Sequence, residues 1–432
     1  MSPVRAAWRD WREAAAAFSP PARRFLLAEF LAWVGHGVFA VLFNLYLVEA
    51  GHSESFVGSA ISLNGLGLGL AALPAGLLAE RWGRARCLIL GAALDGAGLA
   101  VRAAAPDPGV ILGASFVAGA GQSMLAIAAA PFITEHSGAR ERPHLFSTFF
   151  SAALLAGVAG NALGGALPWL AQALPGPLRP TTLGAYRGTL LAGAAIALAA
   201  GVVLARLRGL REAPLAREAA RAPREATRRL RPIACNFLLI GMGAGLVIPF
   251  MNLYFANRFA CSSAQIGLWF AGAQVLTAIA GLLAPAAARR FGRLRAATAS
   301  QLMSLPFLVS LGAEHHLPLA VAAFWLRATL MQASTPLLQN FVMDALPPGL
   351  RARSTSLNHL AWNIGWALSA TLSGVVIERF GFAVPFYVTA VLYGAAAITF
   401  YRAFRSAPEA AAGEAALNED AKGSRGTSPF TD

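Results

Sequence analysis

A few ionisable side chains inside long apolar stretches have the greatest potential for chemistry in this sequence. Asp95 lies well inside the apolar run 87–105, and Glu29 lies near the start of another. Apolar surroundings favour the neutral form of a carboxyl group, so such an acid can take up and release a proton. Asp95, and after it Glu29, are therefore candidates for proton coupling. Arg102 follows Asp95 by seven residues on the same helical face, so a structural ion pair is the competing interpretation.

Arg327 is a basic residue in a comparable position, about ten residues into the apolar run 317–343. A charge near the middle of a membrane-spanning helix must face the protein interior. We expect Arg327 to contact an anionic substrate group or a protonatable acid, or else to be the structural partner of a buried polar group. Other polar residues that could line a cavity, or simply join two helices by a hydrogen bond, are His36, Asn44, Asn252 and Gln332, with His359 and Asn363 in a later run.

Membrane-spanning helices must position these residues. Of the 432 residues, 56% are hydrophobic and 13% are charged, whereas soluble proteins carry about 25% charged residues. About 20 apolar residues span the hydrocarbon core, and runs of this length satisfy their backbone hydrogen bonds in lipid as helices. We predict an all-α membrane protein with twelve transmembrane helices. The predicted spans are 25–48, 56–79, 87–105, 109–134, 145–173, 186–206, 231–257, 264–288, 296–313, 317–343, 354–378 and 381–404.

Arginine is distributed unevenly between the two sides of these spans. The N-terminus, the connectors after even-numbered spans and the C-terminal tail are rich in arginine. The opposite side has only Arg102, Arg179, Arg187, Arg258 and Arg379. The positive-inside rule therefore predicts a multi-pass protein of the cell inner (plasma) membrane with cytoplasmic N- and C-termini. The net charge of +14 lies in short connectors rather than in a basic patch, so we expect no nucleic-acid partner.

The connector after the second span has the most distinctive spacing. Residues 76–86 read Gly-Leu-Leu-Ala-Glu-Arg-Trp-Gly-Arg-Ala-Arg. The pattern Gly-x-x-x-(Asp or Glu)-Arg-x-Gly-Arg resembles the signature loop of the major facilitator superfamily (MFS). Glu80 stands where aspartate is usual, and Ala85 stands where a second basic residue is common.

The two halves of the chain repeat this and other patterns in register. Residues 80–86 align with residues 289–295, a shift of 209 positions (289 − 80). Glu135 aligns with Asp344, and Arg142 with Arg351, by the same shift. Asn-Leu-Tyr follows a Gly-x-Gly pair in both the first and the seventh span. These matches predict the duplication of a six-helix unit, and an even number of helices makes the two copies parallel.

The resemblance covers nearly all of residues 25–404 and implies two pseudo-twofold-related six-helix bundles. We predict an N-terminal cytoplasmic segment 1–24, bundles 25–206 and 231–404, a cytoplasmic linker 207–230 and a disordered cytoplasmic tail 405–432. The resemblance also implies a cytoplasmic latch that holds the bundles together in the outward-facing state. The alternative is positive-inside charge with no gating role. The residues proposed for the latch are Gly76, Glu80, Arg81, Gly83, Arg84, Glu135, Arg142, Asp344 and Arg351.

The fifth span carries a glycine motif that bears on the direction of transport. Gly157, Gly160, Gly164 and Gly165 resemble the Gly-Pro-x-x-Gly-Gly motif of antiporters in the family, with Asn161 in place of the proline. The glycines permit close packing against a neighbouring helix.

The first functional hypothesis is a monomeric secondary transporter that exports a small amphipathic solute by alternating access, coupled to protons. An importer of a small organic anion that contacts Arg327 is the second, and a non-transporting membrane sensor or assembly factor is the third. We expect no enzyme activity and no cofactor. We expect no metal site either, because Cys87, Cys235 and Cys261 lie far apart. A phosphate-binding Walker loop is excluded, because the only lysine, Lys422, follows Ala421 instead of glycine.

Overall fold

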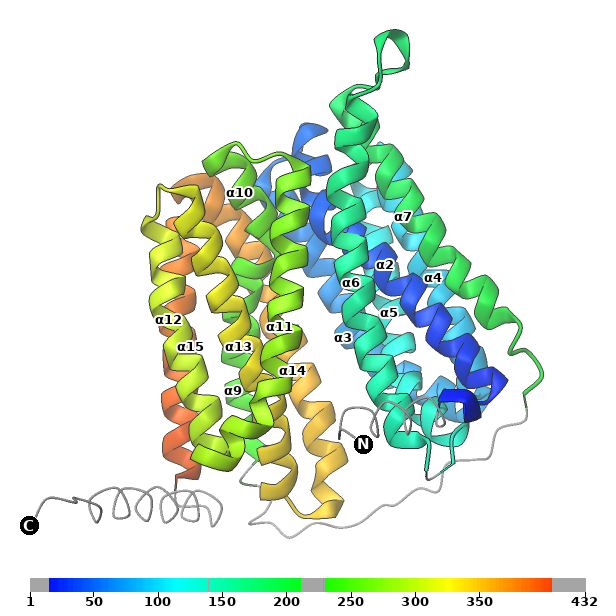
Figure 1. Ribbon diagram of the computed structural model, residues 1–432, viewed down its shortest axis with the longest axis vertical. Helices are drawn as coiled ribbons and strands as arrows, with labels where there is room; N and C mark the ends of the chain where they lie inside the picture. The colour runs from blue at the N-terminus through cyan, green and yellow to red at the C-terminus, as the bar shows by residue number, and fades with distance from the viewer. Residues whose placement is uncertain (1–14, 139, 211–227, 229, 406–432) are drawn as a thin grey trace, which may run out of the picture. The chain divides into compact units, whose positions relative to one another are not determined.

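The computed structural model describes residues 15–138, 140–210, 228 and 230–405, and this part of the chain is almost entirely helical, with no strand (Figure 1). The α-helices are α2 (Pro20–Glu49), α3 (Glu54–Trp82), α4 (Arg84–Ala104), α5 (Pro108–Glu135), α6 (Arg142–Gln172), α7 (Thr182–Ala205), α9 (Leu230–Val247), α10 (Met251–Phe259), α11 (Ser263–Phe291), α12 (Arg293–Ala313), α13 (Leu317–Ala345), α14 (Pro348–Phe380) and α15 (Ala383–Phe404). Two short 3-10 helices are η1 (Gly176–Leu178) and η2 (Ile248–Phe250).

Eleven helical segments in the described part of the chain are long and apolar enough to cross a membrane. One of them, Leu230–Phe259, combines α9, η2 and α10, so the predicted span 231–257 is interrupted at residues 248–250. The remaining helix, α13, is long enough at 29 residues, but Arg327 and several other polar groups lower its mean hydropathy. The all-α membrane fold is thus confirmed. The predicted segments 1–24, 207–230 and 405–432 lie largely outside the described residues.

Side chains that cap helix N-termini fix where several helices begin. Ser53 Oγ accepts from Phe56 N at 3.3 Å, and Asp107 Oδ1 accepts from Val110 N at 2.9 Å. Each cap satisfies one of the four N–H groups that lack a partner at the start of a helix. Between α3 and α4 the chain turns at Gly83, whose φ of +91° suits glycine best.

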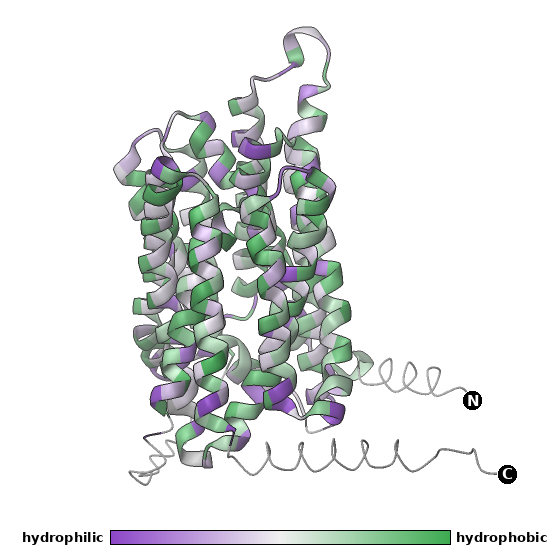
Figure 2. Cartoon of the chain, turned by 90° about the vertical axis from the view of Figure 1, so that its left-hand side faces the viewer, coloured by the Kyte–Doolittle hydropathy of each residue, from purple (hydrophilic) through white to green (hydrophobic). Residues whose placement is uncertain are grey.

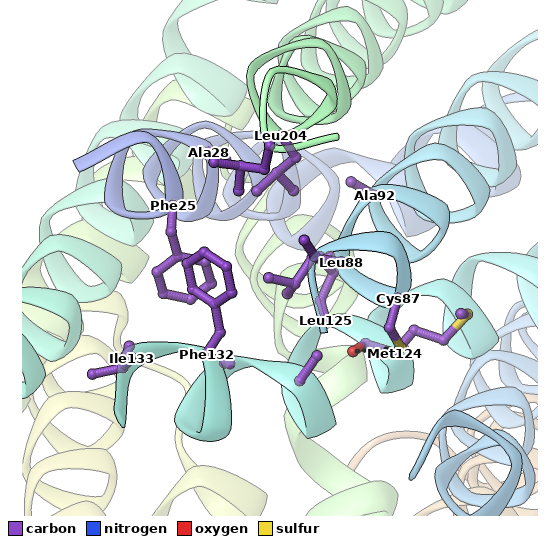
Figure 3. Packing of buried hydrophobic residues seen from close by; sticks show 14 of the residues in the cluster. Phe25, Ala28, Cys87, Leu88, Ala92, Met124, Leu125, Phe132, Ile133 and Leu204 are labelled. Carbon is purple, nitrogen blue, oxygen red and sulfur yellow. Dashed lines mark hydrogen bonds between the residues drawn. The ribbon is translucent and has the colours of Figure 1, made fainter. Parts of the chain in front are cut away.

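Two compact units make up the described chain. The first contains α2–α7 together with residues 248–274 and 367–379, and the second contains α9, α12, α13, α15 and the rest of α11 and α14. The predicted bundle bounds 25–206 and 231–404 stay a prediction. Each unit has its own apolar core. In the first, Phe25 of α2 packs on Phe132 of α5 with ring centroids 5.3 Å apart (Figure 3).

Hydrophobic residues occupy the length of the helices, and hydrophilic residues gather toward the helix ends (Figure 2). Large apolar side chains that remain exposed include Leu73, Leu282 and Val391, each more than 70% exposed. So many exposed apolar groups are unfavourable in water but match the hydrocarbon of a bilayer. In the second unit, Phe341, Phe400 and Phe404 form an aromatic cluster between α13 and α15.

Candidate functional site

A buried histidine–carboxylate pair joins α2 to α4 in the first unit. His36 Nε2 lies 3.0 Å from Asp95 Oδ2, and the two side chains are 22% and 1% exposed. Gln122 of α5 donates from Nε2 to the other carboxylate oxygen of Asp95 at 3.4 Å. The sequence placed His36 among possible substrate contacts and Asp95 among proton carriers, and the structure brings them together.

Glycine makes this arrangement possible. A Cβ at Gly121 would overlap the backbone nitrogen of Asp95, so α5 approaches α4 at this position as only glycine allows. The close approach brings Gln122, the next residue, to the Asp95 carboxylate. Sequence reasoning missed Gln122. The only available signal was an amide next to a glycine in the middle of an otherwise apolar run.

Two further buried ionisable residues, Arg102 and Glu29, act electrostatically on His36. Arg102 is buried on α4 and stacks over the ring of Phe43, with its Cζ 3.9 Å from the ring centroid. Among the described residues, Arg102 Nε has no hydrogen-bond partner, and no ion pair joins Arg102 to Asp95. Arg102 and Asp95 therefore interact through their charges without a direct contact, and Asp95 is hydrogen-bonded to His36 and Gln122. Glu29 on α2 is buried as well, and its charge and that of Arg102 both act on His36.

Arg327 lies in the second unit and is 4% exposed. Its Nη2 donates to Tyr393 Oη of α15 at 3.1 Å. This is a contact with a buried polar group, the second of the two roles expected from the sequence. Gln332 on the same helix is exposed, and Asn363 donates to the carbonyl of His359 one turn earlier. The structure does not gather these residues of the second unit around Arg327.

Asn44 and Asn252 contact each other directly. Asn44 Nδ2 donates to Asn252 Oδ1 at 3.0 Å, and Asn252 Nδ2 donates to the carbonyl of Val41 at 2.9 Å. Both side chains are buried. The two residues that the duplication places in equivalent positions are thus hydrogen-bonded to one another within the first unit.

Ion pairs at the arginine-rich ends of the two units are equivalent by the shift of 209 positions. In the first unit Arg84 Nη2 lies 2.8 Å from Glu135 Oε1, and in the second unit Arg293 pairs with Asp344. The acids at the ends of α5 and α13 therefore pair with arginines that begin α4 and α12, as expected for acids near connectors. Glu80 and Arg81 are exposed.

The arginine that follows each acid closes the end of the same helix. Arg142 Nη2 donates to the carbonyl of Ser137 at 3.1 Å, and Arg351 Nε donates to the carbonyl of Leu346 at 3.3 Å. Ser137 and Leu346 are again 209 positions apart (346 − 137). Cations are favoured at the carbonyl end of a helix, so both arginines stabilise the helix before them. Apart from its chain neighbours and the backbone of its own helical turn, nothing in the described chain would lie within 4 Å of a Cβ added at Gly76, and its role in the latch stays a prediction.

Comparisons with known proteins agree with this architecture. The sequence profile described as Major Facilitator Superfamily matches residues 25–234 and, a second time, residues 233–430. A search of curated protein sequences found no match. Among solved structures, a bacterial homologue of the human lysosomal transporter Spinster, in an inward-facing and occupied conformation, has a TM-score of 0.74 at 16% identity, over 90% of this chain and 98% of that one.

Two other transporters of known structure are similar in fold. The nucleoside transporter NupG, as its D323A mutant, has a TM-score of 0.71 at 14% identity, over 89% of this chain and 100% of its own. A D-xylose–proton symporter has a TM-score of 0.67 at 16% identity, over 90% of this chain and 97% of its own. At 14–16% sequence identity, the similarity to these structures shows the fold alone.

Proposed function

Because the chain belongs to the Major Facilitator Superfamily, we propose that it is a secondary transporter that moves a small amphipathic solute by alternating access and couples this movement to protons at the His36–Asp95 pair. The observation that carries the proposal is the 3.0 Å contact between a carboxylate that is 1% exposed and an imidazole that keeps partial exposure. Gain or loss of one proton changes the net charge of this pair, and a net charge inside the membrane is energetically costly. Protonation can therefore favour one conformation of the transporter over another.

The surroundings of the pair support proton exchange rather than a fixed ion pair. Glu29 and Asp95 are acids, His36 and Arg102 are bases, and Gln122 is neutral, so the charges can balance in more than one protonation state. Histidine is the side chain whose proton affinity suits exchange near neutral pH. His36 keeps part of its surface open, which supports a role as the member through which the proton enters and leaves.

The direction of transport belongs to the same proposal. We place export of an amphipathic compound first, because few charged side chains occur in the predicted spans. The glycines of α6 are consistent with a family exporter, although Asn161 replaces the antiporter proline. Arg327 donates to Tyr393, so no observation favours the anion importer over the exporter.

The remaining sequence predictions form part of the proposed mechanism. The Arg84–Glu135 and Arg293–Asp344 pairs would stiffen the cytoplasmic ends of the helices that carry the latch, with Glu80 as the acid that closes it. The protein would act as a monomer in the inner membrane, with both termini in the cytoplasm. A sensor without transport activity needs no latch. The ion pairs kept in the connectors of both halves therefore argue against that function.

Proteoliposomes that contain the pH-sensitive dye pyranine test the proposal directly. Wild-type protein is challenged with a panel of amphipathic compounds, with uridine and D-xylose as polar comparators. We expect at least one amphipathic compound to drive proton movement, and we expect Asp95→Asn to abolish that movement while the compound still raises the thermal stability of the variant. Glu49→Gln is the matched control, because Glu49 is an exposed carboxylate at the end of α2.

Two results would contradict the proposal in different ways. Proton movement that persists in Asp95→Asn would remove the His36–Asp95 pair from the coupling mechanism. Solute transport that is insensitive to an imposed pH gradient would show that the protein is a facilitator without proton coupling.

A further inference from the structure

Four arginines gather at one end of the first unit, apart from the ion pairs described above. They are Arg23 and Arg24 in the first turns of α2, and Arg206 and Arg208 after the end of α7, and all four are exposed. Arg24 Nη1 donates to the carbonyl of Arg206 at 3.2 Å, so the start of α2 adjoins the end of α7. Within the described ranges, no carboxylate forms an ion pair with any of the four. This part of the described surface therefore carries positive charge that can attract an anion.

Two of these side chains are held in place by backbone carbonyls. Arg23 Nη2 donates to the carbonyl of Ala16 at 2.6 Å, and Arg24 donates to that of Arg206. A guanidinium has five N–H donors, so each of these arginines keeps donors for a further acceptor. Its planar shape matches the oxygens of a phosphate, and a side chain that is already fixed loses less entropy when it binds. The arginines thus provide hydrogen-bond donors that are positioned in advance for a phosphate group.

An exposed apolar surface adjoins the arginines on both helices. Leu198, Val202 and Arg206 are spaced by four residues, so they lie on one face of α7, and the two apolar side chains are 37% and 64% exposed. On α2, Leu27 follows Arg23 by four residues and is 51% exposed. Cations next to exposed apolar groups match the chemistry of a phospholipid, in which a phosphate adjoins acyl chains.

We propose that this surface binds one anionic phospholipid. The lipid phosphate lies among the four arginines, and the acyl chains follow the exposed apolar side chains of α2 and α7. The residues of this lipid site are Arg23, Arg24, Leu27, Leu198, Val202, Arg206 and Arg208. A zwitterionic phospholipid binds less tightly, because its own cation offsets the charge of its phosphate. A soluble phosphate lacks the contacts with the apolar side chains.

Such a lipid joins the ends of two helices that already pack closely. A Cβ at Gly35 of α2 would overlap the carbonyl oxygen of Gly193 on α7, so the two backbones approach closely near the middle of both helices. Glu29 and His36 are carried by α2 as well, so a lipid that holds the first turns of α2 against α7 stabilises the unit that contains these groups. The lipid site does not depend on whether the chain transports a solute.

Native mass spectrometry of the full-length protein in detergent micelles measures the binding of single lipids. The protein is titrated with dioleoyl phosphatidylglycerol, and dioleoyl phosphatidylcholine, which has the same acyl chains, is the comparator. We expect phosphatidylglycerol to bind about tenfold more tightly than phosphatidylcholine, and we expect Arg206→Gln/Arg208→Gln to reduce this preference to about twofold. That variant removes two charges but keeps the backbone carbonyl that accepts from Arg24.

Arg289→Gln/Arg290→Gln is the matched control, because these exposed arginines lie near the end of α11 in the second unit and the change in charge is the same. We expect this control to keep the parental preference. Leu27→Asn/Val202→Asn tests the contacts with the acyl chains, and we expect it to weaken the binding of both lipids about equally. Unchanged binding in that variant would contradict the placement of the acyl chains.

Equal affinity of the wild-type protein for the two lipids would overturn the proposal. A loss of preference in the α11 control as large as that in Arg206→Gln/Arg208→Gln would overturn it as well, because the effect would then reflect net charge alone. Displacement of phosphatidylglycerol by an equal concentration of glycerol 3-phosphate would overturn the assignment to a lipid. If a double variant does not fold, the single variants Arg206→Gln and Val202→Asn replace it, and we expect each to change the same quantity by a smaller factor.

Discussion

At the scale of single residues, two side chains occupy positions that are unusual for their residue type. Asp95 is a carboxylate inside a membrane-spanning helix, and it is tolerated because His36 and Gln122 hydrogen-bond to it. Ala260 is a residue with a Cβ in the left-handed backbone region, where glycine is usual. The first position is stabilised by its contacts. The second retains backbone strain where α10 ends.

Ala260→Gly removes this strain. A left-handed conformation costs an L-residue about 1–2 kcal/mol, and part of the gain is offset because glycine increases the entropy of the unfolded chain. We expect the variant to be more stable by about 0.5–1 kcal/mol, measured as the free energy of unfolding in mixed micelles with increasing SDS. Ala264→Gly, in the first turn of α11, is the comparison and is expected to be destabilising. A loss of stability in Ala260→Gly would show that the conformation is not strained.

At the scale of helices, the closest contacts depend on glycines. A Cβ at Gly119 of α5 would overlap the carbonyl oxygen of Asn64 on α3, and a Cβ at Gly67 of α3 would overlap the carbonyl oxygen of Phe116 on α5. Backbones that approach this closely gain packing energy, which drives helix association in lipid. These positions therefore fix how α3 and α5 cross.

Gly119→Ala should force α3 and α5 apart and cost about 2–3 kcal/mol, because backbone atoms, unlike side-chain ends, cannot move aside. Gly113→Ala on the same helix is the control, since its added Cβ would have no described atom within 4 Å apart from its chain neighbours and the backbone of its own helical turn. We expect the control to be neutral or slightly stabilising, because alanine favours the helix by about 1 kcal/mol. Thermal unfolding of both variants, followed by tryptophan fluorescence, distinguishes the cases. Equal stability of the two variants would contradict the predicted contact.

At the scale of the whole molecule, the duplication extends to side-chain contacts, but the copies differ in burial. The Arg84–Glu135 side chains are 3% and 23% exposed, whereas those of Arg293 and Asp344 are 37% and 46% exposed. Water screens the second pair much more strongly. The same contact is therefore expected to contribute differently to the stability of the two units.

Glu135→Ala should destabilise the protein by about 2 kcal/mol, because it removes a partner of a buried guanidinium, whereas Asp344→Ala should cost less than about 1 kcal/mol. The measurement is the free energy of unfolding of each variant. A double-mutant cycle with Arg84→Met and Arg293→Met isolates each pairwise term. A larger coupling energy for the Arg293–Asp344 pair would contradict the interpretation by burial.

The sequence alone determined the membrane fold and its duplication. The features that did so are the order of the apolar runs, the repeated connector motifs and the concentration of arginine on one side of the predicted spans. These features are periodic or local, so they can be read without coordinates. Only the tertiary structure decided which polar groups meet. Asp95 and Arg102 share one helix face, yet Asp95 hydrogen-bonds to His36 of α2 and to Gln122 of α5, and α5 comes this close because residue 121 is glycine. The Pro249 carbonyl likewise accepts a hydrogen bond from Asn44, 205 positions earlier in the chain, a contact that no local sequence pattern predicts.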